Sequence, residues 1–359
     1  MIRALTFLLL IPLNLTLLIA QPVIDSTDMP VPGETLKRTI IIDPENLDYL
    51  SSGVSHTWNF SAIDGNEQTA DTFVTVNSTN LAYAAVFNNP LDPEHRATVA
   101  SPQPPLGSMP GVTIEKMYMF FKRTSSFYGQ VGYGAEINEV PVPVRFDDAD
   151  ILYRFPLEYG NIDTSESFYD INIPSLGYNS ESRFRINTVD GWGTIYLPAD
   201  TFEVMRVKTV AQIRDSIYID SLGFGFGFNR TETEYKWLAE GQHVPVFHII
   251  VRSGGMGGGS TSVDGWFFDS RDHTGIQNHL SIDDINISPN PADGTLRISN
   301  PEGSLVNYRI FSISGQELMS GSFTGSGHEI ITESLKPATY LICLQNEQSI
   351  LTRIFSVSR

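Results

Sequence analysis

Runs of strand-forming residues, cut short by proline, glycine and polar turns, recur along most of the chain. Residues 201–211 and 244–251 are typical, because successive side chains fall on opposite faces of an extended segment. No long segment keeps the 3.6-residue period of an amphipathic helix. With 29 glycines, 21 prolines and 11% aromatic residues in 359, the pattern is typical of sandwiches and barrels rather than of alternating β-α units. The sequence therefore predicts an all-β fold whose larger part is a β-sandwich or jelly-roll-like structure.

Four segments have less regular patterns. We expect a strand at residues 81–87, a proline-rich loop at 101–111, a loop followed by an acidic turn at 141–150, and a glycine turn at 190–193. Each predicted loop or turn would separate the strands on either side of it.

The N-terminus has the features of a secretory signal peptide. Arg3 supplies a positive charge, residues 5–19 form an apolar run, and Ala20 is a small residue before a cleavage site at Gln21. The run is short and uneven for a membrane anchor, and no cysteine follows it to carry a lipid. We therefore expect residues 1–20 to be removed during export.

The net charge of −18 is concentrated in one part of the chain. Residues 21–284 hold 17 basic and 35 acidic side chains, whereas residues 285–359 hold five basic and six acidic ones. Binding to nucleic acid requires clustered lysine and arginine to neutralise phosphates, so this composition excludes nucleic-acid binding as the expected function. The charge is suited to keeping an exported protein soluble.

Cys343 is the only cysteine, so no disulfide can form within the chain. It lies in a strand-like run, residues 338–344, which favours a structural role over a catalytic one. The fold must therefore be stabilised by hydrophobic cores.

Polarity divides the exported chain into three parts. We expect a β-rich passenger at residues 21–270, a polar linker at 271–284 and a compact module at 285–359. The passenger is either one extended sandwich or two subdomains that meet near residue 159. The size and strand-like runs of the C-terminal module fit a small immunoglobulin-like sandwich of seven strands.

Four short motifs follow one another in the C-terminal module. A Pro-Asn-Pro turn precedes a glycine and a strand, residues 308–318 run from a strand into a second glycine, residues 335–342 form the third motif, and residues 353–357 form a last strand. Proline opposes helix formation at the residue before it, asparagine favours local turns, and glycine suits positive φ. The distinctive residues are Pro289, Asn290, Pro291, Gly294, Gly315 and Tyr340.

These motifs resemble those of the C-terminal sorting domains (type A) of the bacterial type IX secretion system. Ala338 stands where the family usually has glycine, which affects the detail of one turn. The resemblance implies that the chain crosses the inner membrane by its signal peptide and the outer membrane through the type IX translocon. It also implies a Gram-negative host, removal of the module by a cell-surface sortase, and a passenger that is secreted or attached to surface lipopolysaccharide.

The passenger offers little to identify an activity. Residues 189–198, 204–208 and 235–238 resemble uncharacterised secreted proteins that carry the same tail, and that resemblance implies no chemistry. The chain lacks the His-Glu-x-x-His, Gly-x-Ser-x-Gly and phosphate-loop patterns. We therefore predict no catalytic or cofactor-binding residues and a non-catalytic binding or structural module. The alternative is a secreted hydrolase acting on polysaccharide or peptide, which carboxylates clustered in a cleft would favour.

Three further features carry weaker hypotheses. Asp147, Asp148 and Asp150 could bind calcium through carboxylate oxygens, against the interpretation of a solvated acidic turn. His243 and His248 are expected to face opposite sides of a strand and so not to share a metal. In residues 222–228 phenylalanine alternates with glycine, which predicts either an aromatic core strand or an exposed platform for sugars.

Overall fold

The computed structural model confirms the all-β prediction. It describes residues 21–104, 107–109, 112–174, 176–220, 223–255, 261–271, 285–300, 303, 305–313, 315–345 and 350–358. The predicted signal peptide and most of the predicted linker, residues 272–284, lie outside the described residues. No helix within the described ranges is long and apolar enough to cross a membrane.

The larger sheet of the passenger has nine strands. Its order is β2-β10-β11-β12-β13-β14-β1-β3, with β9 pairing to β10. Three long strands at its centre form antiparallel ladders, interrupted only by one bulge in β10, so their inward side chains are aligned across the sheet on either side of it. The strands are β1 (Thr35–Ile41), β2 (His56–Asn59), β3 (Gly65–Thr72), β9 (Ile162–Ile173), β10 (Gly177–Tyr196), β11 (Thr201–Ile219), β12 (Phe224–Ala239), β13 (Phe247–Gly254) and β14 (Thr261–Phe268).

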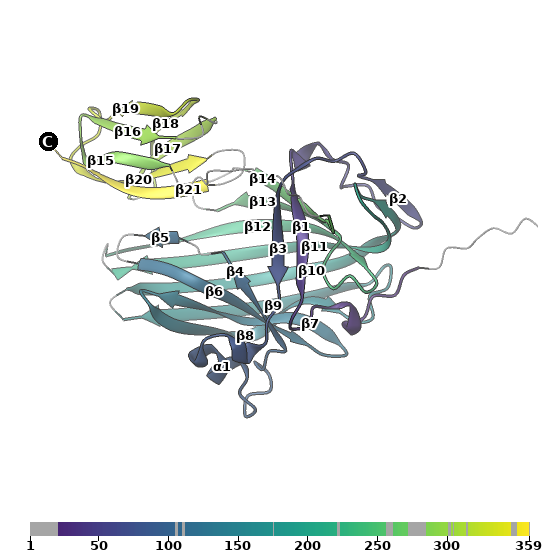
Figure 1. Ribbon diagram of the computed structural model, residues 1–359. Helices are drawn as coiled ribbons and strands as arrows, with labels where there is room; N and C mark the ends of the chain where they lie inside the picture. Colours follow the sequence, from purple (N-terminus) through teal and green to yellow (C-terminus); the bar gives the residue numbers. More distant parts are fainter. Residues whose placement is uncertain are drawn as a thin grey trace, which may run out of the picture.

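A five-stranded sheet stacks on the larger one (Figure 1). One buried cluster joins the two sheets, with Tyr128 and Tyr153 from the smaller sheet packed among Met205, Val207 and Leu238 from the larger. The larger sheet contains strands that precede residue 159 (β1, β2 and β3) and strands that follow it (β9 to β14). The smaller sheet consists of β4 (Val99–Gln103), β5 (Gly107–Met109), β6 (Val112–Arg123), β7 (Phe127–Ile137) and β8 (Val140–Arg154).

The strand expected at residues 81–87 is wrong, because Leu81–Phe87 is the helix α1. The Asn80 side chain caps it by accepting a hydrogen bond from the Ala82 N–H at 2.9 Å. Tyr83 and Phe87, four residues apart, then share the buried face, and Phe87 stacks on Phe120 of β6 at 4.0 Å between ring centres. Tertiary packing and the cap therefore decide the conformation of this apolar run.

Three predicted loops or turns are also largely strands. The proline-rich segment contributes to β4 and β5, and residues 141–150 lie within β8. Both β4 and β8 are edge strands, where the missing N–H of a proline need not leave a neighbour unpaired. The predicted turn at 190–193 is a bulge inside β10. Gly193 is required there, because a Cβ would lie 2.0 Å from the carbonyl oxygen of His56 on β2.

Arg206 of β11 fastens a loop to the larger sheet. Its side chain is only 1% exposed and lies over the rings of Tyr235 and Trp237. The guanidinium donates to both carboxylate oxygens of Asp190, at 2.8 and 2.9 Å, and to the backbone carbonyls of residues 49–51. This buried cation is therefore fully compensated by hydrogen bonds.

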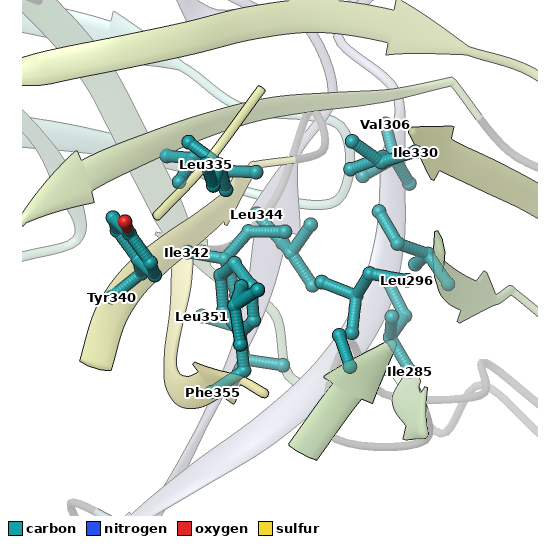
Figure 2. Close-up of a cluster of buried hydrophobic side chains, with 14 of the residues drawn as sticks. Ile285, Leu296, Val306, Ile330, Leu335, Tyr340, Ile342, Leu344, Leu351 and Phe355 are labelled. Carbon is teal, nitrogen blue, oxygen red and sulfur yellow. The ribbon is translucent and has the colours of Figure 1, made fainter. Parts of the chain in front are cut away.

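The C-terminal module has the seven strands expected. Strands β15, β16 and β19 form one layer, and β18, β17, β20 and β21 form the other. Apolar side chains from both layers point toward one another and form a core whose members lie between Ile285 and Val357 (Figure 2). The strands are β15 (Asn286–Asp293), β16 (Thr295–Ser299), β17 (Val306–Ser312), β18 (Glu317–Phe323), β19 (Gly327–Ile331), β20 (Ala338–Gln345) and β21 (Ile350–Val357). Cys343 lies half-buried on β20, and burial raises the pKa of its thiol.

Candidate functional site

The Pro-Asn-Pro turn, residues 289–291, lies where β15 passes from one layer of the module to the other. The strand first pairs with β16, and Ala292 then pairs with β21. Between these pairings the Asn290 side chain acts in place of a strand neighbour. Its Nδ2 donates to the carbonyl of Ile354 at 3.2 Å, and its Oδ1 accepts from the Ser356 N–H at 2.9 Å. The motif therefore joins the two layers through the last strand.

The other motif residues shape the turns of the module. Gly294 and Gly315 have φ of 79° and 83°, the left-handed region that the sequence predicted for them. Tyr340 is buried against Phe355, and its hydroxyl donates to the carbonyl of Lys336 at 2.7 Å. This bond ties β20 to the turn that precedes it, as the tyrosine corner does in immunoglobulin-like sandwiches.

A cleft of about 1180 Å³ opens between the two sheets of the passenger. The smaller sheet contributes a mainly apolar wall, with Met117, Met119, Phe121 and Leu152 among its side chains. The larger sheet contributes a wall of charged side chains. Concave sites that combine apolar side chains with polar groups are typical of ligand-binding sites.

The charged wall is an interlocked set of ion pairs, which we call the charge ladder. Arg185 donates to both oxygens of Asp150 at 2.8 Å, and its third nitrogen donates to Glu234 at 2.8 Å. Further along, Arg230 donates to Glu181 at 2.8 Å and also bonds Glu232. The ladder consists of Asp150 on β8, Glu181, Arg183 and Arg185 on β10, and Arg230, Glu232, Glu234 and Lys236 on β12.

The inner end of the ladder is buried, and the pairing sets the charges of its members. Burial alone would raise the pKa of Asp150, but the charge and hydrogen bonds of Arg185 outweigh it and hold the pKa below its usual value. Burial likewise opposes ionisation of Glu234, yet Lys236, His248 and Arg185 together hold its pKa well below the usual value. Burial lowers the pKa of Lys236 and of His248. Asp150 and Glu234 therefore carry no proton to donate at neutral pH.

Asp71 on β3 behaves differently from these two carboxylates. It pairs with Arg38 at 3.0 Å, and Arg38 lies over the Trp266 ring on the same side of the cleft. Burial raises the pKa of Asp71, although the charge of Arg38 opposes the shift. Asp71 is therefore the carboxyl group of the cleft whose pKa burial raises while that of Asp150 and Glu234 is lowered.

The cleft is acidic as a whole despite its arginines. Six cationic and nine acidic side chains line its described surface, for a formal charge of −3 with histidine neutral. An anionic ligand would be repelled on entry. The cations are Arg38, Arg183, Arg185, Arg230, Lys236 and Arg252, and the acids are Asp43, Glu45, Glu67, Asp71, Asp150, Glu181, Glu232, Glu234 and Asp264.

The alternating phenylalanines continue the inward face of β12. Phe224, Phe226 and Phe228 are stacked in a row with ring centres 5.9 and 6.1 Å apart, and Arg230 comes next on the same face. The three rings are half-buried and belong to none of the buried clusters of the described chain. On the glycine side, Tyr218 approaches so closely that a Cβ on Gly225 would lie 2.7 Å from its ring. The prediction of alternate faces is confirmed.

The structure does not bring the calcium candidates together. Asp147 and Asp148 are exposed, whereas Asp150 points inward to Arg185. The expectation that His243 and His248 lie on one strand is wrong, because His243 precedes β13 and contacts Glu34, whereas His248 lies on β13 and contacts Glu234. Among the described residues, no three or more His, Cys, Asp or Glu side chains are placed to hold a metal ion.

The charge ladder was missed at the level of sequence, although a signal for it exists. Charged residues occupy every second position in Arg230–Glu232–Glu234–Lys236 and again in Glu181–Arg183–Arg185. In a strand this spacing places them on one face. Which face is inward depends on pairing with residues about 50 positions away, so the cleft itself could not be predicted.

The family model described as the secretion system C-terminal sorting domain matches residues 286–358. No curated protein and no solved structure matches the chain. The matched segment contains the seven strands and the four motifs described above. Such a tail directs a bacterial protein to export, with the cell surface or the medium as its destination. Residues 286–358 are therefore a type IX secretion C-terminal sorting domain.

Proposed function

We propose that the chain is cargo of the type IX translocon of a Gram-negative bacterium. The signal peptide is cleaved between Ala20 and Gln21, and a cell-surface sortase removes the sorting domain by cutting within residues 271–284. The passenger is then released or attached to lipopolysaccharide on the outer membrane. The sorting-domain match and the charged, apolar and small-residue order of the N-terminus support this route.

Removal of the sorting domain should abolish release from the cell. We expect the full chain at the surface or in the medium, and a chain that ends at Asp284 in the periplasm, because the truncated chain keeps only the signal for the inner membrane. Cell fractionation and immunoblotting of the passenger measure this. A full-length Ile331→Ser variant, changed at an exposed side chain of the module, is the matched control. Equal export of the truncated and full chains would contradict the proposal.

We further propose that the passenger is a non-catalytic module that binds a saccharide chain. The observation that carries this proposal is the inward face of β12, where three stacked phenyl rings are followed by alternating charged groups. Sugar rings offer an apolar face for contact with aromatic rings and hydroxyl groups that both donate and accept hydrogen bonds. One strand of the sheet offers both kinds of contact in succession.

The paired state of the ladder favours a neutral ligand. Each guanidinium has five N–H donors and each carboxylate about four acceptor sites, so ion pairing leaves donors and acceptors free. Hydroxyl groups can use them without adding a net charge. An acidic polymer would meet a lining of charge −3, and a ligand ion would have to compete with pairs already formed.

The clustered carboxylates keep a hydrolase as the second candidate. The observation that favours it is Asp71, the carboxyl group whose pKa burial raises. A glycoside hydrolase needs one protonated and one ionised carboxyl group flanking the bond. Asp71 would serve as the acid, whereas the paired state of Asp150 and Glu234 suits binding better than proton transfer.

Affinity electrophoresis in gels of hydroxyethylcellulose, galactomannan or starch separates the two candidates. We expect retardation of the full chain in at least one gel without release of reducing ends, and roughly fivefold weaker retardation of Phe226→Ala. Tyr196→Ala, at an exposed aromatic ring elsewhere on the sheet, is the control and should bind as the unchanged chain does. Release of reducing ends that Asp71→Asn abolishes would establish the hydrolase instead. No retardation in any gel would refute saccharide binding on the inward face of β12.

A further inference from the structure

The outward face of the larger sheet carries a second hollow. A groove of about 640 Å³ crosses β9, β10, β11 and β12 on the side of the sheet opposite the charge ladder. Phe168, which is 39% exposed, and Phe184 form its apolar part. The side chains of these strands alternate between the two faces, so none of the groove's outward side chains belongs to the cleft.

Strand pairing places the polar side chains of the groove in two rows. Phe168 lies opposite Ser182, which lies opposite Arg214, which lies opposite Asn229. The second row runs in the same way from Glu166 through Phe184 and Gln212 to Thr231. Directly opposed residues have Cβ atoms about 4.5–5.5 Å apart. Each row therefore combines one phenyl ring with a line of hydrogen-bonding groups.

Six polar side chains of the groove differ from those of the cleft in being unpaired. Within the part of the chain that the structure describes, the six side chains make no ion pair and no side-chain hydrogen bond with other protein groups. Their donors and acceptors are consequently free for a ligand. The six are Glu166, Ser182, Gln212, Arg214, Asn229 and Thr231.

We propose that this groove is a second saccharide-binding site, for a neutral polysaccharide chain. Hydroxyl, amide, guanidinium and carboxylate groups in rows beside two phenyl rings suit a ligand with apolar ring faces and many hydroxyl groups. Three carboxylates (Asp147, Asp148 and Glu166) and three arginines (Arg183, Arg214 and Arg230) line the groove, so its formal charge is zero. A lining without net charge suits a neutral polymer.

Two sites on opposite faces of the larger sheet would let one passenger hold two chains. The two rows of the groove are outward side chains, although Arg183 and Arg230 of the charge ladder also line it. Its variants therefore separate the two sites: substitutions at Phe168 and Phe184 change the groove, and Phe226→Ala changes the inward face.

The test uses the full chain in gels of hydroxyethylcellulose, galactomannan and starch, with polygalacturonate as an acidic gel. In a gel that retards the unchanged chain, we expect Phe168→Ala and Arg214→Ala each to weaken retardation at least fivefold. Ile186→Ala, at a residue 37% exposed on the same face of β10 and outside the groove, should leave retardation unchanged. Phe226→Ala should leave binding at the groove intact, so it should keep the contribution to retardation that is lost in Phe168→Ala.

Several outcomes would overturn the groove proposal. Unchanged retardation of both Phe168→Ala and Arg214→Ala would refute the groove as a binding site. Loss of retardation in Phe226→Ala alone would also refute it, and would support binding on the inward face of β12. Retardation by polygalacturonate alone would refute the neutral ligand. Failure of every neutral gel, with binding of a lysine-rich peptide measured by fluorescence anisotropy and abolished by Glu166→Gln, would assign the groove to a basic peptide.

Discussion

Arg206→Met should lower the free energy of unfolding of the passenger by about 3–5 kcal/mol, the usual cost of removing one partner from a buried ion pair. Methionine keeps the apolar stem but leaves Asp190 and the carbonyls of Tyr49 and Leu50 without the Arg206 donor, whereas the Ser51 carbonyl keeps its bond from Trp58. Urea unfolding followed by tryptophan fluorescence measures the change. The four tryptophans are Trp58, Trp192, Trp237 and Trp266, so the signal comes from the passenger.

Arg214→Met is the matched control for this measurement. Arg214 lies on the same strand, faces outward and has no bonding partner among the described side chains. Its replacement should change the free energy of unfolding by no more than about 0.5 kcal/mol. Equal losses in the two variants would show that the hydrogen bonds of Arg206 do not stabilise the loop.

Asp150→Asn should cost about 3 kcal/mol at pH 7, because Arg185 would lose a bidentate carboxylate in a dry environment. The effect should depend on pH in a defined direction. The pKa of Asp150 is lower in the folded chain than the value of about 3.9 in an unfolded one. Its contribution is therefore complete above the unfolded value and is lost as the pH falls through the folded value.

The difference between the unchanged chain and Asp150→Asn should thus be constant from pH 7 to 5 and narrower at pH 3. Urea unfolding at the three pH values tests this. Asp148→Asn, on the same strand but exposed and unpaired, should differ little from the unchanged chain at any of them. A difference that grew on acidification would contradict the assigned pairing.

Local signals account for the parts of the structure that could be predicted from sequence. The sorting motifs are short and contiguous, and Gly294 and Gly315 have the positive φ that their turns predict. The errors occur where distant residues decide the outcome. Leu81–Phe87 becomes a helix because the smaller sheet receives its buried face, and residues 190–193 continue a strand because they lie between β11 and β2. The cleft depends on the same long-range pairing, since Asp150 meets Arg185 across 35 residues.

The single thiol in the chain is half-buried on β20 of the folded sorting domain, where burial raises its pKa. A maleimide added during transport should react slowly with Cys343 while the domain is folded, and quickly once the domain is unfolded. The labelling rate therefore distinguishes transport of the folded sorting domain from transport of the unfolded domain. The passenger contains no sulfhydryl group to confuse the reading.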